Sequence, residues 1–474
     1  MSVTKPRLKK TALAAVALAV LGAGTAAAVF ARSGRDVTTT SAEAYKLYQK
    51  GLEDERRLYH KDALAAYARA LELDPHFTMA TLRLAGNVAG RDRERARSLV
   101  QCASRNPGNL NDREKLFLAV FEAEILEKDL KKSGELIREY VRRFPDDPEG
   151  YYRLAGVLMR EGKGDETLAT YERLLSLDPN QAVAYNFLGY HFIGRRDFVK
   201  GEDYLKRYRF LAPDQATPYD SLGELYANTG RYDEAEEHLK RALQIRPDFV
   251  PAVGHLGTLE VGRGNPEAAV GYFRRAAEMS ESWKDKLMYV GATTMALLDA
   301  GRPEDALAML DETAAAPPAI SPKEGFSLRY HTTLTRAVVL ALAGRAAEAE
   351  AELALLPAVP ADLDSKGKES LERAVVGPKA AIAGARGDLE GAVRLAREIL
   401  AGDKEGDGDS FPYYPGTFRL RVRLAGALVV LGRPDEAREE LRPVLAVNPR
   451  FAPALAVIAR VEGRAGDAKG TAGR

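Results

Sequence analysis

Prolines recur at a strictly constant interval in the middle of this chain of 474 residues. The repeated positions are Pro145, Pro179, Pro213 and Pro247, each numbered 34 higher than the one before, and leucines keep the same interval at Leu154, Leu188, Leu222 and Leu256. A fixed period of this length is typical of a stack of small units, each packed against its neighbours. The chain is therefore predicted to form a repeat array and not one globular core.

Residues 216–249 show how one unit of this period is built. Tyr219, Leu222, Gly223 and Tyr226 are three or four residues apart, a spacing that places them on one face of a helix. Gly230 follows and is expected to end this helix, because glycine readily adopts the left-handed conformation found after many helices.

The second half of the same unit predicts a second helix. Ala235, Leu239 and Ala242 have helical spacing and form its buried face, and Pro247 ends it. The small side chains of Gly223 and Ala235 are expected to let the two helices approach each other closely. Each unit is thus predicted to be a helix hairpin.

This pattern resembles the tetratricopeptide repeat. Units 148–181, 182–215, 216–249 and 250–283 carry it in succession. In the unit 182–215, the matching residues are Tyr185, Leu188, Gly189, Phe192, Gly201, Leu205, Tyr208 and Pro213. The resemblance implies an all-α, right-handed α-solenoid. Counting the units along the sequence gives about eleven hairpins, which would follow an N-terminal transmembrane or signal helix.

The repeat is less regular on both sides of this central stretch. Residues 44–147 are predicted to hold degenerate units, because the step from Pro75 to Pro107 is shorter than the regular period and the step from Pro107 to Pro145 is longer. Residues 284–463 are predicted to hold looser units with inserted loops and a C-terminal cap helix. In that stretch, the mid-unit glycine of the regular units reappears as Gly301, Gly344, Gly387 and Gly432. The small and polar tail at 464–474 is predicted to be disordered.

The resemblance also implies a peptide-binding groove on the concave face made by the first helices. At positions that face this groove in the family, beginning with the second residue of a unit, the sequence carries Glu149, Tyr152, Met159, Asn186, Tyr190, Asp220 and Glu224. These side chains suit an extended or helical peptide, or they only fill and solvate the groove. Tyr151, Tyr185 and Tyr219 are expected to be core residues one place away.

The N-terminus predicts export. A basic segment, 1–10, precedes an uncharged, Ala- and Val-rich stretch at 11–31, which is long enough for a bilayer core at about 1.5 Å per residue. A linker at 32–43 follows. The cations before the stretch place the N-terminus in the cytoplasm. The stretch is either a single-pass anchor in a bacterial inner membrane, with the repeats in the periplasm or outside, or a cleaved signal peptide of a secreted or periplasmic protein.

Composition and motifs argue against several function classes. The chain has 69 Lys and Arg against 68 Asp and Glu, so no overall field favours nucleic acid. Signatures of phosphate loops, nucleophile elbows and zinc proteases are absent, and the histidines lack ligand spacing. No catalysis, cofactor, metal or small-molecule substrate is expected. The lone Cys102 is expected to be a buried thiol.

An acidic segment at 403–414 partly imitates a calcium-binding loop. Tyr414 stands where such a loop needs a bidentate glutamate, so a solvated acidic loop is the favoured interpretation.

Two functions follow from the resemblance and the N-terminal stretch. The first is a non-catalytic scaffold whose groove binds peptide segments or subunits of a cell-envelope assembly. The alternative is a sensor or regulatory partner of a separate signalling enzyme, such as a bacterial serine/threonine kinase.

Overall fold

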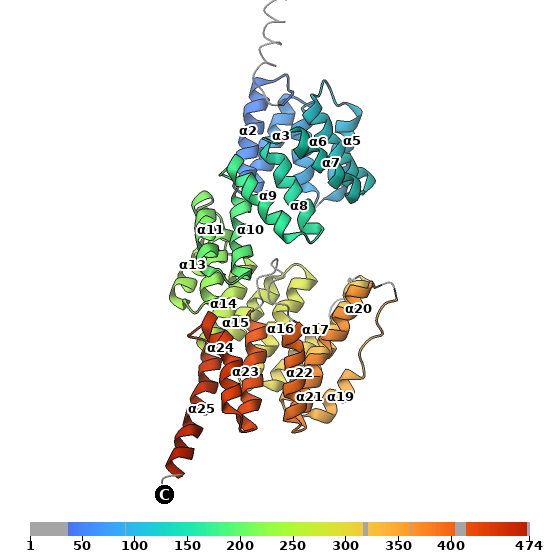
Figure 1. The fold of residues 1–474 in the computed structure, drawn as a ribbon. Helices are drawn as coiled ribbons and strands as arrows, with labels where there is room; N and C mark the ends of the chain where they lie inside the picture. Colours follow the sequence, from blue (N-terminus) through green and yellow to red (C-terminus); the bar gives the residue numbers. More distant parts are fainter. Residues whose placement is uncertain (1–36, 91, 316–320, 362, 403–413, 472–474) are drawn as a thin grey trace, which may run out of the picture. The chain divides into compact units, whose positions relative to one another are not determined.

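A computed structural model describes residues 37–90, 92–315, 321–361, 363–402 and 414–471, and in these ranges the regular structure is helical throughout (Figure 1). The predicted anchor at 11–31 and most of the acidic segment at 403–414 lie outside the described residues. None of the described helices combines the length and the apolar character that a membrane crossing requires. The chain divides between Leu188 and Gly189 into two compact units, here called unit 1 and unit 2.

Unit 1 is a succession of paired helices: α2 with α3, α4 with α5, α6 with α7 and α8 with α9. Their bounds are α2 Ala42–Arg56, α3 His60–Leu73, α4 Thr78–Val88, α5 Arg93–Arg105, α6 Asp112–Phe121, the π-helix η1 Glu122–Glu127, α7 Leu130–Arg143, α8 Pro148–Arg160 and α9 Gly164–Leu177. Helix α10, Ala182–Gly194, contains the division between the two units.

Unit 2 continues the pairing of helices. Its remaining helices are α11 Phe198–Leu211, α12 Ala216–Asn228, α13 Tyr232–Ile245, α14 Val250–Arg263, α15 Pro266–Met279, α16 Trp283–Asp299, α17 Pro303–Ala314, α18 Pro322–Leu342, α19 Ala346–Leu353, α20 Ser365–Ala374, α21 Val376–Ala385, α22 Leu389–Gly402, α23 Tyr414–Val430, α24 Pro434–Val447 and α25 Ala452–Thr471. The number of repeat units, about eleven, stays a prediction.

Many turns between the two helices of a hairpin have a left-handed residue, as the mid-unit glycines predict. Gly162, Gly230, Gly264, Gly301, Gly344, Gly387 and Gly432 all have positive φ, between 69° and 83°. In three turns the same conformation falls on Leu58, Lys128 and Arg196, at φ 64°, 59° and 63°. A side chain makes this conformation costly, by roughly 1–2 kcal/mol. Those three turns therefore store strain that the glycine turns avoid.

Close helix packing explains a second set of small residues. A Cβ atom added to Gly223 would lie 2.6 Å from Leu239 Cγ and 3.3 Å from the carbonyl oxygen of Ala235. The predicted close approach of the two helices at Gly223 and Ala235 is confirmed.

Unit 2 also contains a contact between helices far apart in sequence. Helix α25 packs on α14, and Asn448, the residue after α24, lies against α12 and α13. The hydroxyl of Tyr232 donates to Asn448 Oδ1 at 3.2 Å, and Asn448 Nδ2 donates to the carbonyl oxygen of Ala227 at 3.4 Å. The guanidinium of Arg450 lies 5.2 Å from the centre of the Tyr232 ring. In a simple solenoid each repeat contacts only its neighbours, so this contact, here called the clasp, closes unit 2 on itself.

Several local predictions were wrong. Tyr151, Tyr185 and Tyr219 are half-buried and not core residues. The Tyr219 ring has arginine side chains over it and Tyr151 donates to a backbone carbonyl, contacts that suit a ring at the rim of a hairpin. Cys102 is an exposed free thiol and not a buried one, because it falls on the outer face of α5.

Two segments contain more helix than the sequence predicted. Among the loops expected to be inserted in 284–463, the segment after α19 contains α20, a helix without buried residues. Helix α25 continues to Thr471, past the predicted end of the cap helix at 463.

Candidate peptide-binding groove

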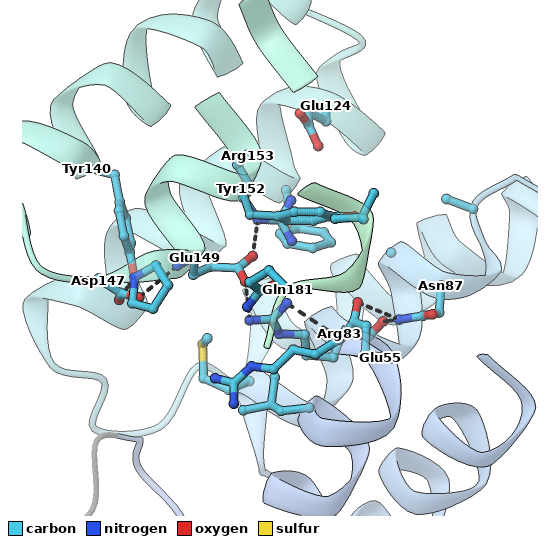
Figure 2. Close-up of a pocket in the computed structure, with 18 of the residues that line it drawn as sticks. Glu55, Arg83, Asn87, Glu124, Tyr140, Asp147, Glu149, Tyr152, Arg153 and Gln181 are labelled. Carbon is cyan, nitrogen blue, oxygen red and sulfur yellow. Dashed lines mark hydrogen bonds and ion pairs between the residues drawn. The ribbon is translucent and has the colours of Figure 1, made fainter. Parts of the chain in front are cut away.

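Unit 1 contains a groove of about 1000 Å³, lined by side chains from α2, α4, α8 and η1 (Figure 2). Its apolar lining includes Leu52, Met79, Ile125, Tyr152 and Val183. The volume lies within the usual range of ligand sites, about 300–1,000 Å³. The groove is therefore large enough to receive side chains of a partner.

The floor of the groove is built around the buried guanidinium of Arg83 in α4. Its side chain is only 7% exposed and lies between two carboxylates from other helices. Nη2 lies 2.6 Å from Glu149 Oε2 of α8, and Nη1 lies 3.6 Å from Glu55 Oε2 of α2. A buried charge needs such partners, because removing one costs roughly 3–5 kcal/mol.

The same carboxylates dominate the electrostatics of Arg83. Burial works to lower the pKa of this guanidinium, but Glu149 and Glu55 outweigh it and hold the pKa well above its usual value. Burial also raises the pKa of Tyr48, which interacts with Arg83, to about 12, so its phenol stays neutral. The guanidinium of Arg83 therefore stays positively charged at any physiological pH.

The ion pairs continue outward from Arg83 in both directions. On one side, Glu149 accepts from Arg153 Nε at 2.7 Å, and the Arg153 guanidinium lies 4.4 Å from the centre of the Phe117 ring. On the other side, Glu55 accepts from Tyr67 at 2.7 Å and from Asn87 Nδ2 at 3.1 Å. The guanidiniums of Arg83 and Arg153 are neutralised within this network. Figure 2 shows it running across the groove beside the ring of Tyr152.

One edge of the groove is a π-helix, η1, which follows α6 directly. Its last residue, Glu127, is followed by Lys128 in the left-handed conformation, and the helix places Glu124 and Ile125 at the groove. A π-helix takes more residues per turn than an α-helix and often marks a functional site. Here it lies in the segment from Pro107 to Pro145, where the step between successive prolines is longer than the regular period. The irregular spacing of the sequence thus coincides with an irregular helix.

The structure divides the predicted groove residues between the two units. Glu149 and Tyr152 line the groove of unit 1. Met159, at the end of the same helix, is 45% exposed, and its sulfur accepts from the Tyr171 hydroxyl at 3.7 Å. Asn186 in α10 is half-buried and does not belong to the groove lining.

Tyr190, Asp220 and Glu224 form a polar cluster in unit 2, together with a histidine that the sequence did not single out. His255 Nδ1 lies 2.8 Å from Asp220 Oδ1, and His255 Nε2 lies 3.6 Å from Glu224 Oε1. The Tyr190 hydroxyl donates to Glu224 Oε2 at 2.8 Å. These side chains come from α10, α12 and α14, and each forms a hydrogen bond or an ion pair with another member of the cluster.

Charge and burial in this cluster determine its protonation. Burial works to lower the pKa of His255, but Asp220 and Glu224 raise it to about 9. Burial also raises the pKa of Glu224, against the attraction of His255. A charged imidazole between two acids holds three successive hairpins together, so in unit 2 these predicted groove residues contact each other.

Sequence reasoning missed the central residues of both arrangements. Arg83 and Glu55 lie in degenerate units, where the register of the repeat is lost. For His255 a signal was present, because it follows Asp220 by one period and one further position. Residues one period apart on first helices lie side by side, so an acid and a histidine at this interval indicate a pair.

Comparisons with known proteins support a repeat architecture. Family models described as tetratricopeptide repeat match residues 129–182 and 221–249. No curated protein matches the chain. Similar solved structures include PilW, described as a type IV pilus biogenesis factor (18% identity, TM-score 0.38, covering 46% of this chain and 99% of that one).

Two further structures show similarity of the same low order. One is a tetratricopeptide repeat protein from Parabacteroides merdae (18% identity, TM-score 0.40, covering 56% of this chain and 98% of that one). The other is yeast Tom70 (15% identity, TM-score 0.41, covering 85% and 98%). Scores this low support no inference about function. The family models alone identify the repeats: segments 129–182 and 221–249 of this chain match models of the tetratricopeptide repeat.

Proposed function

We propose that the protein is a non-catalytic scaffold whose unit 1 groove binds a peptide segment of another protein. Tetratricopeptide repeat proteins are generally protein-interaction scaffolds. The observation that carries the proposal is the groove of about 1000 Å³ in unit 1, with apolar side chains above a network that neutralises its own charges.

The groove favours a partner segment without charge at its centre. Arg83 and Arg153 already have carboxylate partners, so an acidic peptide finds neither guanidinium free. Tyr152 is 38% exposed and offers an aromatic face to the groove. Aromatic anchors of this kind carry much of the binding energy at interfaces.

A photo-crosslinking amino acid at position 152, in the groove, tests this proposal in cells. The matched control carries it at position 172, an exposed position of α9 in the same unit. The expected result is adducts with discrete proteins from position 152 and none from position 172. Equal adducts from both positions, or none from either, would contradict a binding groove.

The proposed place of action is the cell envelope, with the chain tethered to a bacterial inner membrane by residues 11–31. The basic segment before an uncharged stretch supports this topology. The partners would then be subunits of an envelope assembly. Protease added to spheroplasts should digest the repeats, and full protection of the repeats would refute this topology.

A further inference from the structure

Helix α11 in unit 2 carries two apolar side chains on its outer surface (Figure 1). Val199 is 76% exposed and Phe210 is 77% exposed, the largest fractions among the bulky apolar side chains that the structure describes. They are separated by about three helical turns, so they lie on one face of the helix. The opposite face, with Gly201, Leu205 and Tyr208, is buried. The outward face of α11 is thus apolar near both ends.

Between these two apolar side chains, the same face is charged. Asp203 lies in the first half of the helix and Arg207 lies one turn later in the second half, and both are exposed. Neither forms a hydrogen bond or an ion pair within the described part of the chain. The neighbouring Lys206 and Glu202, by contrast, pair with each other at 2.9 Å. The outward face therefore carries, in order, an apolar, an acidic, a basic and an apolar side chain.

This order is complementary to itself when a second copy of the helix runs in the opposite direction. If Asp203 lies opposite Arg207 of the second copy, the reciprocal pair forms on the other side of a two-fold axis. In the same register, to within one residue, Val199 of each copy faces Phe210 of the other. A parallel pair of these helices would instead place like charges opposite each other, which is unfavourable.

We propose that this outward face of α11, formed by Val199, Asp203, Arg207 and Phe210, is a docking surface for a second copy of the chain in antiparallel orientation. Every contact occurs twice, because a two-fold interface uses the same patch on both copies. The surface lies outside the groove, which is lined by other helices, so the inference does not depend on peptide binding there. A dimer carries two copies of the groove.

The contact of one helix pair is small, so we expect a weak dimer. Stable complexes bury about 1,200–2,000 Å², and a pair of helices of 14 residues each offers less. The expected dissociation constant is micromolar. Sedimentation equilibrium of the full chain at up to about 100 μM measures it, in a detergent that keeps the predicted apolar stretch at 11–31 in solution. A monomer at every concentration would overturn the proposal.

Phe210→Ala tests the apolar part of the surface. It should weaken dimerisation by at least about tenfold, because the symmetric contact loses two aromatic anchors. The control is Val430→Ala, which shortens another exposed apolar side chain of unit 2 and should change the dissociation constant by less than about twofold. An unchanged dimer in Phe210→Ala would place the contact elsewhere, for example in the stretch at 11–31, and refute the α11 surface.

A charge exchange tests the register. D203R and R207D should each weaken dimerisation at low ionic strength, because each turns two attractive contacts across the axis into two repulsive ones. The double variant D203R/R207D restores opposite charges across the axis and should recover most of the affinity. All these side chains are exposed, and circular dichroism verifies that the variants are folded. A double variant no better than the single ones would contradict the antiparallel pairing.

Disulfide trapping determines the orientation of the two helices, in chains whose exposed thiol at Cys102 is replaced by serine. A mixture of V199C chains and F210C chains should form a disulfide-linked dimer, because the two positions face each other. V199C chains alone should not, because the two copies of position 199 lie about 16 Å apart along the helix axes, beyond the reach of a disulfide. Equal yields from the mixture and from V199C alone, or none from the mixture, would exclude the proposed dimer.

Discussion

Replacing Asn448 by alanine tests whether unit 2 is closed in solution. Asn448 is 2% exposed and its amide joins the hydroxyl of Tyr232 to the carbonyl oxygen of Ala227, more than two hundred residues away in sequence. Asn448→Ala leaves the Tyr232 hydroxyl, on a residue 1% exposed, without this acceptor. An unsatisfied buried group costs about 1–3 kcal/mol, and the lost amide contacts add to it. We expect a loss of about 2–3 kcal/mol in the stability of this region.

Hydrogen exchange with mass spectrometry on the full chain measures this loss locally. Peptides from α13 and from α25 should both exchange faster in Asn448→Ala, since the clasp joins them, whereas peptides of unit 1 should not change. The exposed Asn180→Ala is the control, with an expected effect below about 0.5 kcal/mol.

A double-mutant cycle decides whether the two partners interact. Tyr232→Phe alone should cost about 1 kcal/mol, and the coupling energy with Asn448→Ala should be about 1 kcal/mol. A cost below about 0.5 kcal/mol for Asn448→Ala together with no coupling would refute the clasp, because an open unit 2 leaves both groups in water.

Three further predictions concern charge and backbone strain. The raised pKa of His255, about 9 against 6.5, stabilises unit 2 below pH 6.5, and this contribution of about 3 kcal/mol should be lost as the pH rises towards 9; urea unfolding of His255→Gln should lack that pH dependence. Arg83→Met should destabilise unit 1 by about 3 kcal/mol, whereas Arg69→Met, at an exposed position, should cost less than about 0.5 kcal/mol in the same denaturation. Lys128→Gly should raise the thermal stability of unit 1 by about 1 kcal/mol by removing left-handed strain, and Gly162→Ala should lower it by a similar amount; opposite signs would contradict the strain.

The regular features of the fold could be predicted from the sequence because each depends on neighbours at short range. A glycine after a first helix adopts the left-handed conformation that the adjacent turn requires. Gly223 leaves room for the side chain of Leu239 in the same hairpin. The turn at Arg196 shows the limit of this reasoning, since it keeps the left-handed conformation without glycine.

The candidate site was harder to predict because its contacts cross several repeats. Glu149 and Tyr152 were found by their position in a regular unit, but Arg83, the partner of Glu149, lies 66 residues earlier, beyond two irregular units. An interval that is not a multiple of the period gives no indication that two residues meet. The clasp at Asn448 was missed for the same reason.

Because the chain is synthesised from its N-terminus, the ion pair between Arg83 and Glu149 can form only once Glu149 has been synthesised. Helices α2 to α5 leave the ribosome before Glu149, which lies in α8. Until then, the Arg83 guanidinium has only the more distant carboxylate of Glu55, at 3.6 Å. A partly neutralised guanidinium resists burial, so the first two hairpins should stay loosely packed on the nascent chain. Emergence of α8 would complete the ion pair and let the first four hairpins lock together in one step.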